Sequence, residues 1–168
     1  MLYLIINVLQ NLKVLKNDVL TLYSGLIEAC KEKFKLINKI MAYYFSKTIE
    51  ASFEMAVQRV TIALMSEGFG ILTEIDIKAT LKKKLDVDLY NYKILGACNP
   101  QFAYKALLSE DKIGTMLPCN VIVQERVAGQ VEVSAVDPLA SMQAIENINL
   151  KGIATEVRAR LQKVIEEL

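Results

Sequence analysis

The chain has 168 residues, of which 53% are hydrophobic and 23% charged, and its 20 basic and 19 acidic side chains leave a net charge of +1. This composition predicts one compact domain, with or without an appendage, and excludes a disordered or low-complexity chain. Because the sequence has no histidine, a Ser-His-Asp triad, a Cys-His dyad and an imidazole-bound zinc site are excluded. The near-neutral charge without a basic stripe predicts no nucleic-acid partner.

Three cysteines, Cys30, Cys98 and Cys119, form an odd set without a C-x-x-C spacing. Such a set is typical of free thiols in a reducing compartment rather than of a disulfide framework. We therefore expect a cytoplasmic protein, and we expect no cofactor and no bound metal.

The first 40 residues differ in character from the rest of the chain. Apolar residues recur through them at helical spacing, and six lysines stand against three acids. The pattern predicts a helical extension, and both an accessory helix and an overextended start before Met41 stay open. Its most apolar stretch is too short and too polar for a transmembrane helix, which needs about 20 largely apolar residues. An apolar stripe beside lysines permits contact with a partner or with a membrane surface.

From Met41 onward, cap and turn residues divide the chain into short strands and helices. Ser52 and Asn99 are residue types that cap helices, and Pro100 suits the first helical position. The predicted elements up to residue 108 are a strand over 43–49, a helix between Ser52 and Gly68, a strand over 69–77, a short helix over 79–85, a strand over 92–97 and a helix over 100–108.

The last part of the domain begins with a predicted loop over residues 109–117. Two alternating runs, 120–127 and 130–136, meet near Ala128 and Gly129 and predict a β-hairpin. Asp137 and Pro138 then introduce helical segments over 139–148 and 152–168. Alternating strands and helices together with a hairpin favour a two-layer α+β domain over a doubly wound parallel sheet.

Four segments of residues 41–168 resemble one family. They are GFGILTEIDIKATLKKKL, YKILGACNPQFAYKAL, MLPCNVIVQE and VSAVDP, and together they are similar to the bacterial and archaeal family called domain of unknown function 302. The resemblance implies an α+β domain with a curved, mostly antiparallel sheet backed by helices, and a tendency to form homodimers. It implies no established activity. The recurrent positions of the family fall on Gly68, Phe69, Asp76, Cys98, Asn99, Pro100, Pro118, Cys119, Asn120, Asp137 and Pro138.

Two cysteines of these motifs are candidates for chemistry. Cys98 precedes a predicted helix start, where free N–H groups and the positive end of the helix dipole are expected to lower the pKa of its thiol. If the strand start at Cys119 adjoins that helix start, the two thiols meet, and they can exchange to a disulfide or hold a soft metal such as Cu(I). Packing of a small apolar side chain explains either cysteine as well.

Asn99 and Asn120 each follow one of these cysteines, and an amide offers a donor and an acceptor to a small ligand. Capping alone also explains Asn99. Asp76 lies in a predicted strand and is a base, a ligand or an anchor only if it faces the thiols. We therefore predict a domain that binds a small molecule in a pocket framed by Cys98, Asn99, Cys119, Asn120 and Asp76. The alternatives are a thiol-redox or soft-metal-responsive protein using Cys98 and Cys119, and an interaction module that acts through the N-terminal helix.

Overall fold

The computed structural model describes residues 25–31, 33 and 43–168. Contacts between Cα atoms divide the chain into two compact units, Met1–Ala42 and Tyr43–Leu168. In the first unit the described residues are helical and exposed. The remainder of the extension predicted over residues 1–40 lies outside the described residues.

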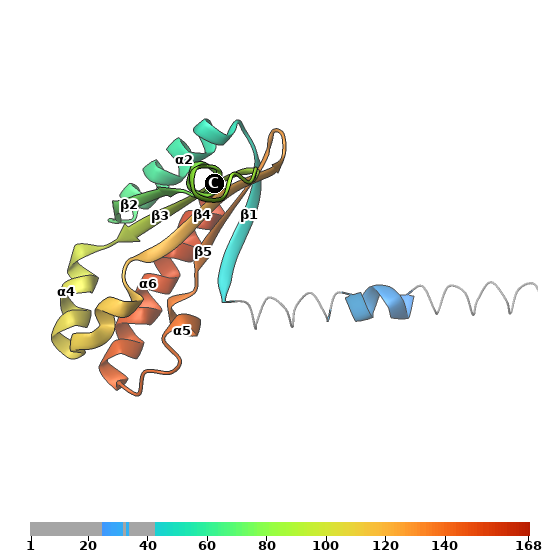
Figure 1. The fold of residues 1–168 in the computed structure, drawn as a ribbon. Coiled ribbons are helices and arrows are strands. Elements are labelled where there is room, and N and C mark those ends of the chain that lie inside the picture. Colours follow the sequence, from blue (N-terminus) through green and yellow to red (C-terminus); the bar gives the residue numbers. More distant parts are fainter. Residues whose placement is uncertain (1–24, 32, 34–42) are drawn as a thin grey trace, which may run out of the picture. The chain divides into compact units, whose positions relative to one another are not determined.

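Five strands form one open sheet in the second unit (Figure 1). Their order is β1-β5-β4-β3-β2, and every pair of neighbours is antiparallel. This arrangement confirms the predicted α+β class and the predicted hairpin of β4 and β5, in which Gly129 has a φ of +80° that glycine adopts without strain. The strands are β1 (Tyr44–Glu50), β2 (Gly70–Asp76), β3 (Asn91–Cys98), β4 (Cys119–Val127) and β5 (Gln130–Val136).

Alternate side chains of the sheet face a layer of helices. Val121 and Val123 of β4 and Val133 of β5 are fully buried, and α2 (Phe53–Ser66) and α6 (Ile148–Glu167) pack against these strands. Burial of each such side chain contributes about 1.5–3 kcal/mol. Because α2 and α6 also contact each other, the main core lies between the sheet and this helical layer, and the domain has the two layers that we predicted.

Local signals set the ends of α2. The hydroxyl of Ser52 accepts a hydrogen bond from the backbone N–H of Met55 at 3.3 Å and so caps the first turn. Gly68, just after the helix, has a φ of +81°, the left-handed conformation that ends helices. Between these points Val60 and Leu64, one helical turn apart, are fully buried.

The stretch over residues 109–117 differs from the predicted loop. It contains a 3-10 helix, η1 (Asp111–Met116), in which Ile113 is fully buried. Ile113 packs with Ala106 of α4 (Pro100–Ser109) and Leu150 of α6 in a second, smaller core cluster. The partners of Ile113 are distant in sequence, which is why the local pattern did not predict an ordered element.

The two C-terminal helices also differ in length from the prediction. The helix expected over 139–148 is a single turn, α5 (Pro138–Ser141), and α6 begins at Ile148 instead of residue 152. The earlier start follows from Asn147, whose side chain accepts a hydrogen bond from the N–H of Asn149 at 3.1 Å. An asparagine in this position caps a helix, but the predicted start of the helix was not based on Asn147.

Candidate functional site

The chain leaves the sheet between two neighbouring strands and returns beside its point of departure. β3 ends at Cys98 and β4 begins at Cys119, and Ala97 pairs with Cys119 across the two strands. The intervening residues, which we call the 99–118 segment, contain α4 and η1. The two Cys-Asn pairs of the sequence thus mark the two ends of this segment.

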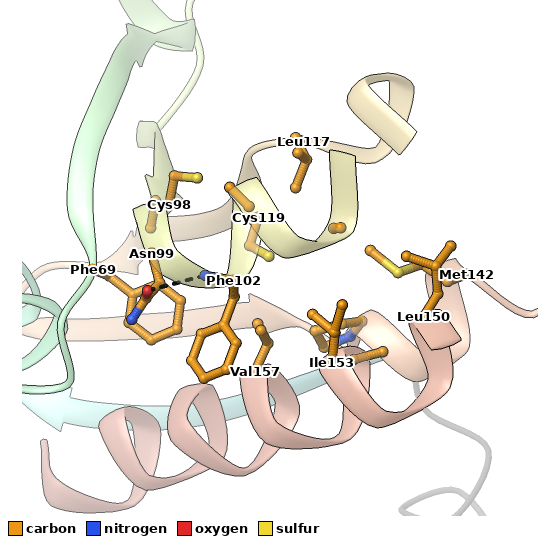
Figure 2. A pocket seen from close by; sticks show the side chains of 15 residues that line it. Phe69, Cys98, Asn99, Phe102, Leu117, Cys119, Met142, Leu150, Ile153 and Val157 are labelled. Carbon is orange, nitrogen blue, oxygen red and sulfur yellow. Dashed lines mark hydrogen bonds between the residues drawn. The ribbon is translucent and has the colours of Figure 1, made fainter. Parts of the chain in front are cut away.

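A pocket lies where α4 faces α6, next to the ends of β3 and β4 (Figure 2). Its internal volume is about 30 Å³, room for at most a few water molecules. Its polar lining consists of Cys98, Asn99 and Cys119, and no charged side chain belongs to the lining. The larger apolar side chains that line it are Phe69, Phe102, Leu117, Met142, Leu150, Ile153 and Val157.

Asn99 is the one amide in this lining, and only 9% of its surface is exposed. Its Oδ1 accepts hydrogen bonds from the backbone N–H groups of Gln101 at 3.2 Å and Phe102 at 3.5 Å, which caps α4 as predicted. Its Nδ2 donates no hydrogen bond among residues 43–168 as described, and because no buried side-chain nitrogen or oxygen there lacks a partner, this atom is reached by solvent. Gly68 leaves room for this nitrogen, since a Cβ at that position would lie 2.9 Å from Nδ2.

Both thiols line the pocket, but neither is activated. Burial raises the pKa of the half-buried Cys98, and burial together with the neighbouring Cys98 raises the pKa of Cys119 to about 11. The expected lowering of the Cys98 pKa is therefore wrong. The physical reason is desolvation, because burial removes the hydration that a thiolate would need, while the side-chain oxygen of Asn99 accepts from the N–H groups at the start of α4. Both side chains are neutral thiols at pH 7.

Asn120 does not line this pocket, contrary to the prediction. Successive residues of a strand point to opposite faces of a sheet, so Asn120 faces away from the helices that cover Cys119. Its cross-strand partner is Gly96, and it lines a hollow on the other face of the sheet.

Asp76 is also far from the thiols, contrary to the prediction. In the pairing of β2 with β3, Gly70 lies opposite Cys98, whereas Asp76 lies opposite Lys93 at the other end of the strands. Asp76 is exposed, and its Oδ1 accepts a hydrogen bond from the N–H of Ala79 at 2.8 Å. It therefore ends β2 and caps α3 (Ile77–Leu85), a role that the predicted continuous strand obscured.

The side of the pocket opposite the cysteine motifs was not predicted from the sequence. Leu150 and Val157 belong to α6, and Met142 follows α5, about 20 to 60 residues from the cysteine motifs along the chain. In Figure 2, Phe102 points from α4 toward Val157. The apolar pair Phe102 and Ala106, one helical turn apart and both buried, was the available signal that α4 buries one face.

A group of charges stands beside Phe102. The guanidinium of Arg160 on α6 lies over the Phe102 ring, 5.3 Å from its centre, and it donates a hydrogen bond to the backbone carbonyl of Glu67 at 3.2 Å. The carboxylate of Glu67 is nearly buried and pairs with Lys163, and this pairing raises the pKa of Lys163. α2, α4 and α6 are joined here by polar contacts.

The other face of the sheet carries no helix among the described residues. A hollow of about 710 Å³ lies on it. Its floor is polar, because Gln124 Nε2 donates to Glu132 at 2.8 Å and the Tyr90 hydroxyl bonds to Gln124 Oε1 at 3.3 Å. Four tyrosines line this open face, namely Tyr43, Tyr44, Tyr90 and Tyr92.

Within 25–31, 33 and 43–168, no group of three or more cysteine and carboxylate side chains is placed to hold a metal ion. Over the same residues, none of the helices combines the length and the apolar character that crossing a membrane requires.

These observations define a small two-layer α+β domain with an open antiparallel sheet and an uncharged pocket beneath the 99–118 segment. The chain belongs to the family described as Domain of unknown function DUF302, whose profile matches residues 45–168. Among solved structures, it is similar to that of an uncharacterized conserved DUF302 protein from Bacillus stearothermophilus, with a TM-score of 0.69 and 25% sequence identity. The match covers 74% of this chain and 96% of the other. No curated protein matches the chain.

Proposed function

We propose that this domain binds a small, uncharged organic molecule in the pocket between α4 and α6. One observation carries the proposal: Asn99 is nine-tenths buried in an otherwise apolar lining, and its Nδ2 is without a partner among the described residues. No buried side-chain nitrogen or oxygen of the described residues lacks a partner, so solvent reaches this N–H. It is free to donate a hydrogen bond to an acceptor atom on a ligand.

The lining also restricts the kind of ligand. No charged side chain lines the pocket, and the raised pKa values keep Cys98 and Cys119 neutral. An ionised ligand would lose its hydration without gaining a counter-charge, which is strongly unfavourable. A compact apolar molecule with one carbonyl-type acceptor matches the residues that are present.

The proposal is tested by recording amide spectra of the ¹⁵N-labelled full chain with three probes, namely cyclohexanone, caprolactam and benzaldehyde. We expect at least one probe to shift the side-chain amide signals of Asn99 and the backbone signals of Ala103 and Ala154, which line the pocket. The amide signals of Asn120, on the other face of the sheet, serve as an internal control and should not move.

Two matched variants test the role of Nδ2. Asn99→Asp keeps the oxygen that caps α4 but removes the donor, and we expect it to weaken probe binding about tenfold, the effect of about 1.4 kcal/mol for one lost hydrogen bond. Asn120→Asp introduces the same charge outside the pocket and should bind as the unchanged protein does. Absence of a pocket shift with all three probes, or equal weakening by both variants, contradicts the proposal.

We also propose that the domain forms a homodimer through the open face of its sheet. The support is the tyrosine-rich hollow together with Arg126 and Glu132, because a surface that carries both charges can pair with a copy of itself across a two-fold axis. Sedimentation at micromolar concentration should show a dimer. Ile122→Glu on this face should give a monomer, whereas Ile62→Glu on the exposed side of α2 should not. A wild-type chain that sediments only as a monomer contradicts this proposal.

The remaining alternatives have less support. Thiol-redox or soft-metal chemistry at Cys98 and Cys119 requires thiolates, and burial raises the pKa of both groups. An interaction through the N-terminal helix depends on residues that lie largely outside the described ones, so it stays a prediction. A cytoplasmic location is likewise inferred, from three cysteines that are all unpaired.

A further inference from the structure

We infer that the 99–118 segment is a lid that opens to admit the ligand and that Arg160 is its latch. This inference rests on the proposed ligand pocket and adds to it the route by which a molecule gains access. Its starting point is size. A volume of about 30 Å³ holds at most a few water molecules and is well below the roughly 150 Å³ of a cavity that holds benzene, so a ring-sized ligand requires the pocket to widen.

The 99–118 segment is attached to the domain in a way that permits such movement. It begins and ends at adjacent positions on neighbouring strands, since Ala97 pairs with Cys119. Its backbone hydrogen bonds join residues of the segment itself, including Ala103 N to Asn99 O and Leu117 N to Gly114 O. The segment can therefore swing outward without breaking a hydrogen bond of the sheet.

The packing of the lid is separate from the main core over most of its length. Ala106 and Ile113 pack with Leu150 in the smaller core cluster, whereas Phe102 belongs to the main cluster. The pocket lies along the boundary between the two clusters, because residues of both line it. Opening the lid requires that Phe102 be withdrawn from beside Val157.

Polar contacts hold the lid closed at two points. Near its start, Arg160 covers the Phe102 ring at 5.3 Å and bonds to Glu67, which ties the lid to α6 and α2. Near its middle, at the last residue of α4, Asn147 Nδ2 donates a hydrogen bond to the carbonyl of Ser109 at 2.9 Å. Arg160 is a positioning residue in this arrangement, because it is not part of the pocket lining.

Hydrogen exchange of the full chain without ligand tests the lid directly. We expect the amides of α4 and η1 to exchange together, at least about tenfold faster than those of β3 and β4, because local opening exposes them before global unfolding does. Arg160→Ala should accelerate α4 exchange a further five- to tenfold or so, by removing a cation–π contact and a hydrogen bond.

Lys105→Ala is the matched control. Lys105 also lies over the Phe102 ring, 5.8 Å from its centre, but it belongs to α4 and moves with the lid. We therefore expect its removal to leave α4 exchange unchanged within about twofold. Exchange of α4 only together with β3 and β4, or equal acceleration by both variants, overturns the inference.

Cyclohexanone binding distinguishes failure of the lid from failure of the pocket. If the lid gates access, Arg160→Ala should raise the rates of cyclohexanone association and dissociation by about the same factor as α4 exchange. Fast α4 exchange without any probe binding contradicts the proposed function but not the lid. Probe binding at equal rates in the wild-type chain and in Arg160→Ala, with α4 exchanging only on global unfolding, contradicts the lid but not the pocket.

Discussion

Cys98 and Cys119 stand on adjacent strands at the two ends of the 99–118 segment and line the same pocket. This proximity affects their acidity, because the neighbouring Cys98 adds to burial in raising the pKa of Cys119 to about 11. The two groups therefore form an uncharged wall of the pocket at neutral pH, and they react slowly as nucleophiles.

Alkylation should follow accessibility. We expect iodoacetamide at pH 8 to label the exposed Cys30 first, the half-buried Cys98 second and the buried Cys119 last, because the buried thiols are both shielded and un-ionised. Peptide mass mapping over time measures the order. In urea the three rates should converge, and labelling of Cys119 before Cys98 in the folded chain contradicts the expectation.

Alkaline pH should destabilise the domain through Cys119. The unfolded thiol ionises near its ordinary pKa of 9.0, while the folded thiol stays protonated to about 11, so the unfolded state loses its proton first. Stability is then unaffected below pH 9 and falls by about 1.4 kcal/mol per pH unit up to about pH 11. Urea unfolding at several pH values should show a smaller decline for Cys119→Ala, in which the raised pKa of Cys98 still contributes, and the full decline for Cys30→Ala.

Substitution of Gly68 should lower stability more than substitution of Gly129. Both glycines have a φ near +80°, which strains an alanine by about 1–2 kcal/mol. At Gly68 a Cβ would also lie 2.9 Å from Asn99 Nδ2, whereas nothing lies within 4 Å at Gly129. We expect Gly68→Ala to lower the free energy of unfolding by about 1 kcal/mol more than Gly129→Ala. Equal losses in urea unfolding would show that the Asn99 side chain moves aside without a cost in stability.

The two capping aspartates should differ in their contribution to stability. Asp76 is exposed and only caps a helix, so Asp76→Ala should destabilise the domain by about 1 kcal/mol and leave cyclohexanone binding unchanged. Asp137 is 6% exposed, caps α5 and pairs with Arg158 at 2.8 Å. Asp137→Ala should lower stability by about 2–4 kcal/mol. Thermal unfolding measures both effects, and a larger loss from Asp76→Ala would contradict this assignment.

The chain from Met41 onward should fold by itself. The unit Tyr43–Leu168 contains the five-stranded sheet, α2, α6 and both core clusters. A fragment covering residues 41–168 should therefore unfold in one cooperative transition, monitored by circular dichroism during heating. A broad, non-cooperative transition would show that residues 1–40 complete the core.

Local chemistry allowed much of the fold to be predicted from the sequence. Ser52, Asn99 and Asp137 each satisfy N–H groups two or three residues away, and Gly129 allows a turn between two alternating runs. Such interactions depend on neighbours within one turn of chain. The same local information was misleading for Asp76, because a strand and a helix meet there without an intervening loop.

The candidate site was predicted only in part because it depends on long-range geometry. The sequence by itself determined that Cys98, Asn99 and Cys119 adjoin a helix start and a strand start. Only the pairing of β2 with β3 placed Asp76 far from the thiols, and only the position of the helical layer decided that Cys119 faces the core while Asn120 faces away. Desolvation in the folded chain then reversed the expected shift in the Cys98 pKa. Strand register, the covered face of a sheet and desolvation are set by residues distant in sequence, and therefore by tertiary structure alone.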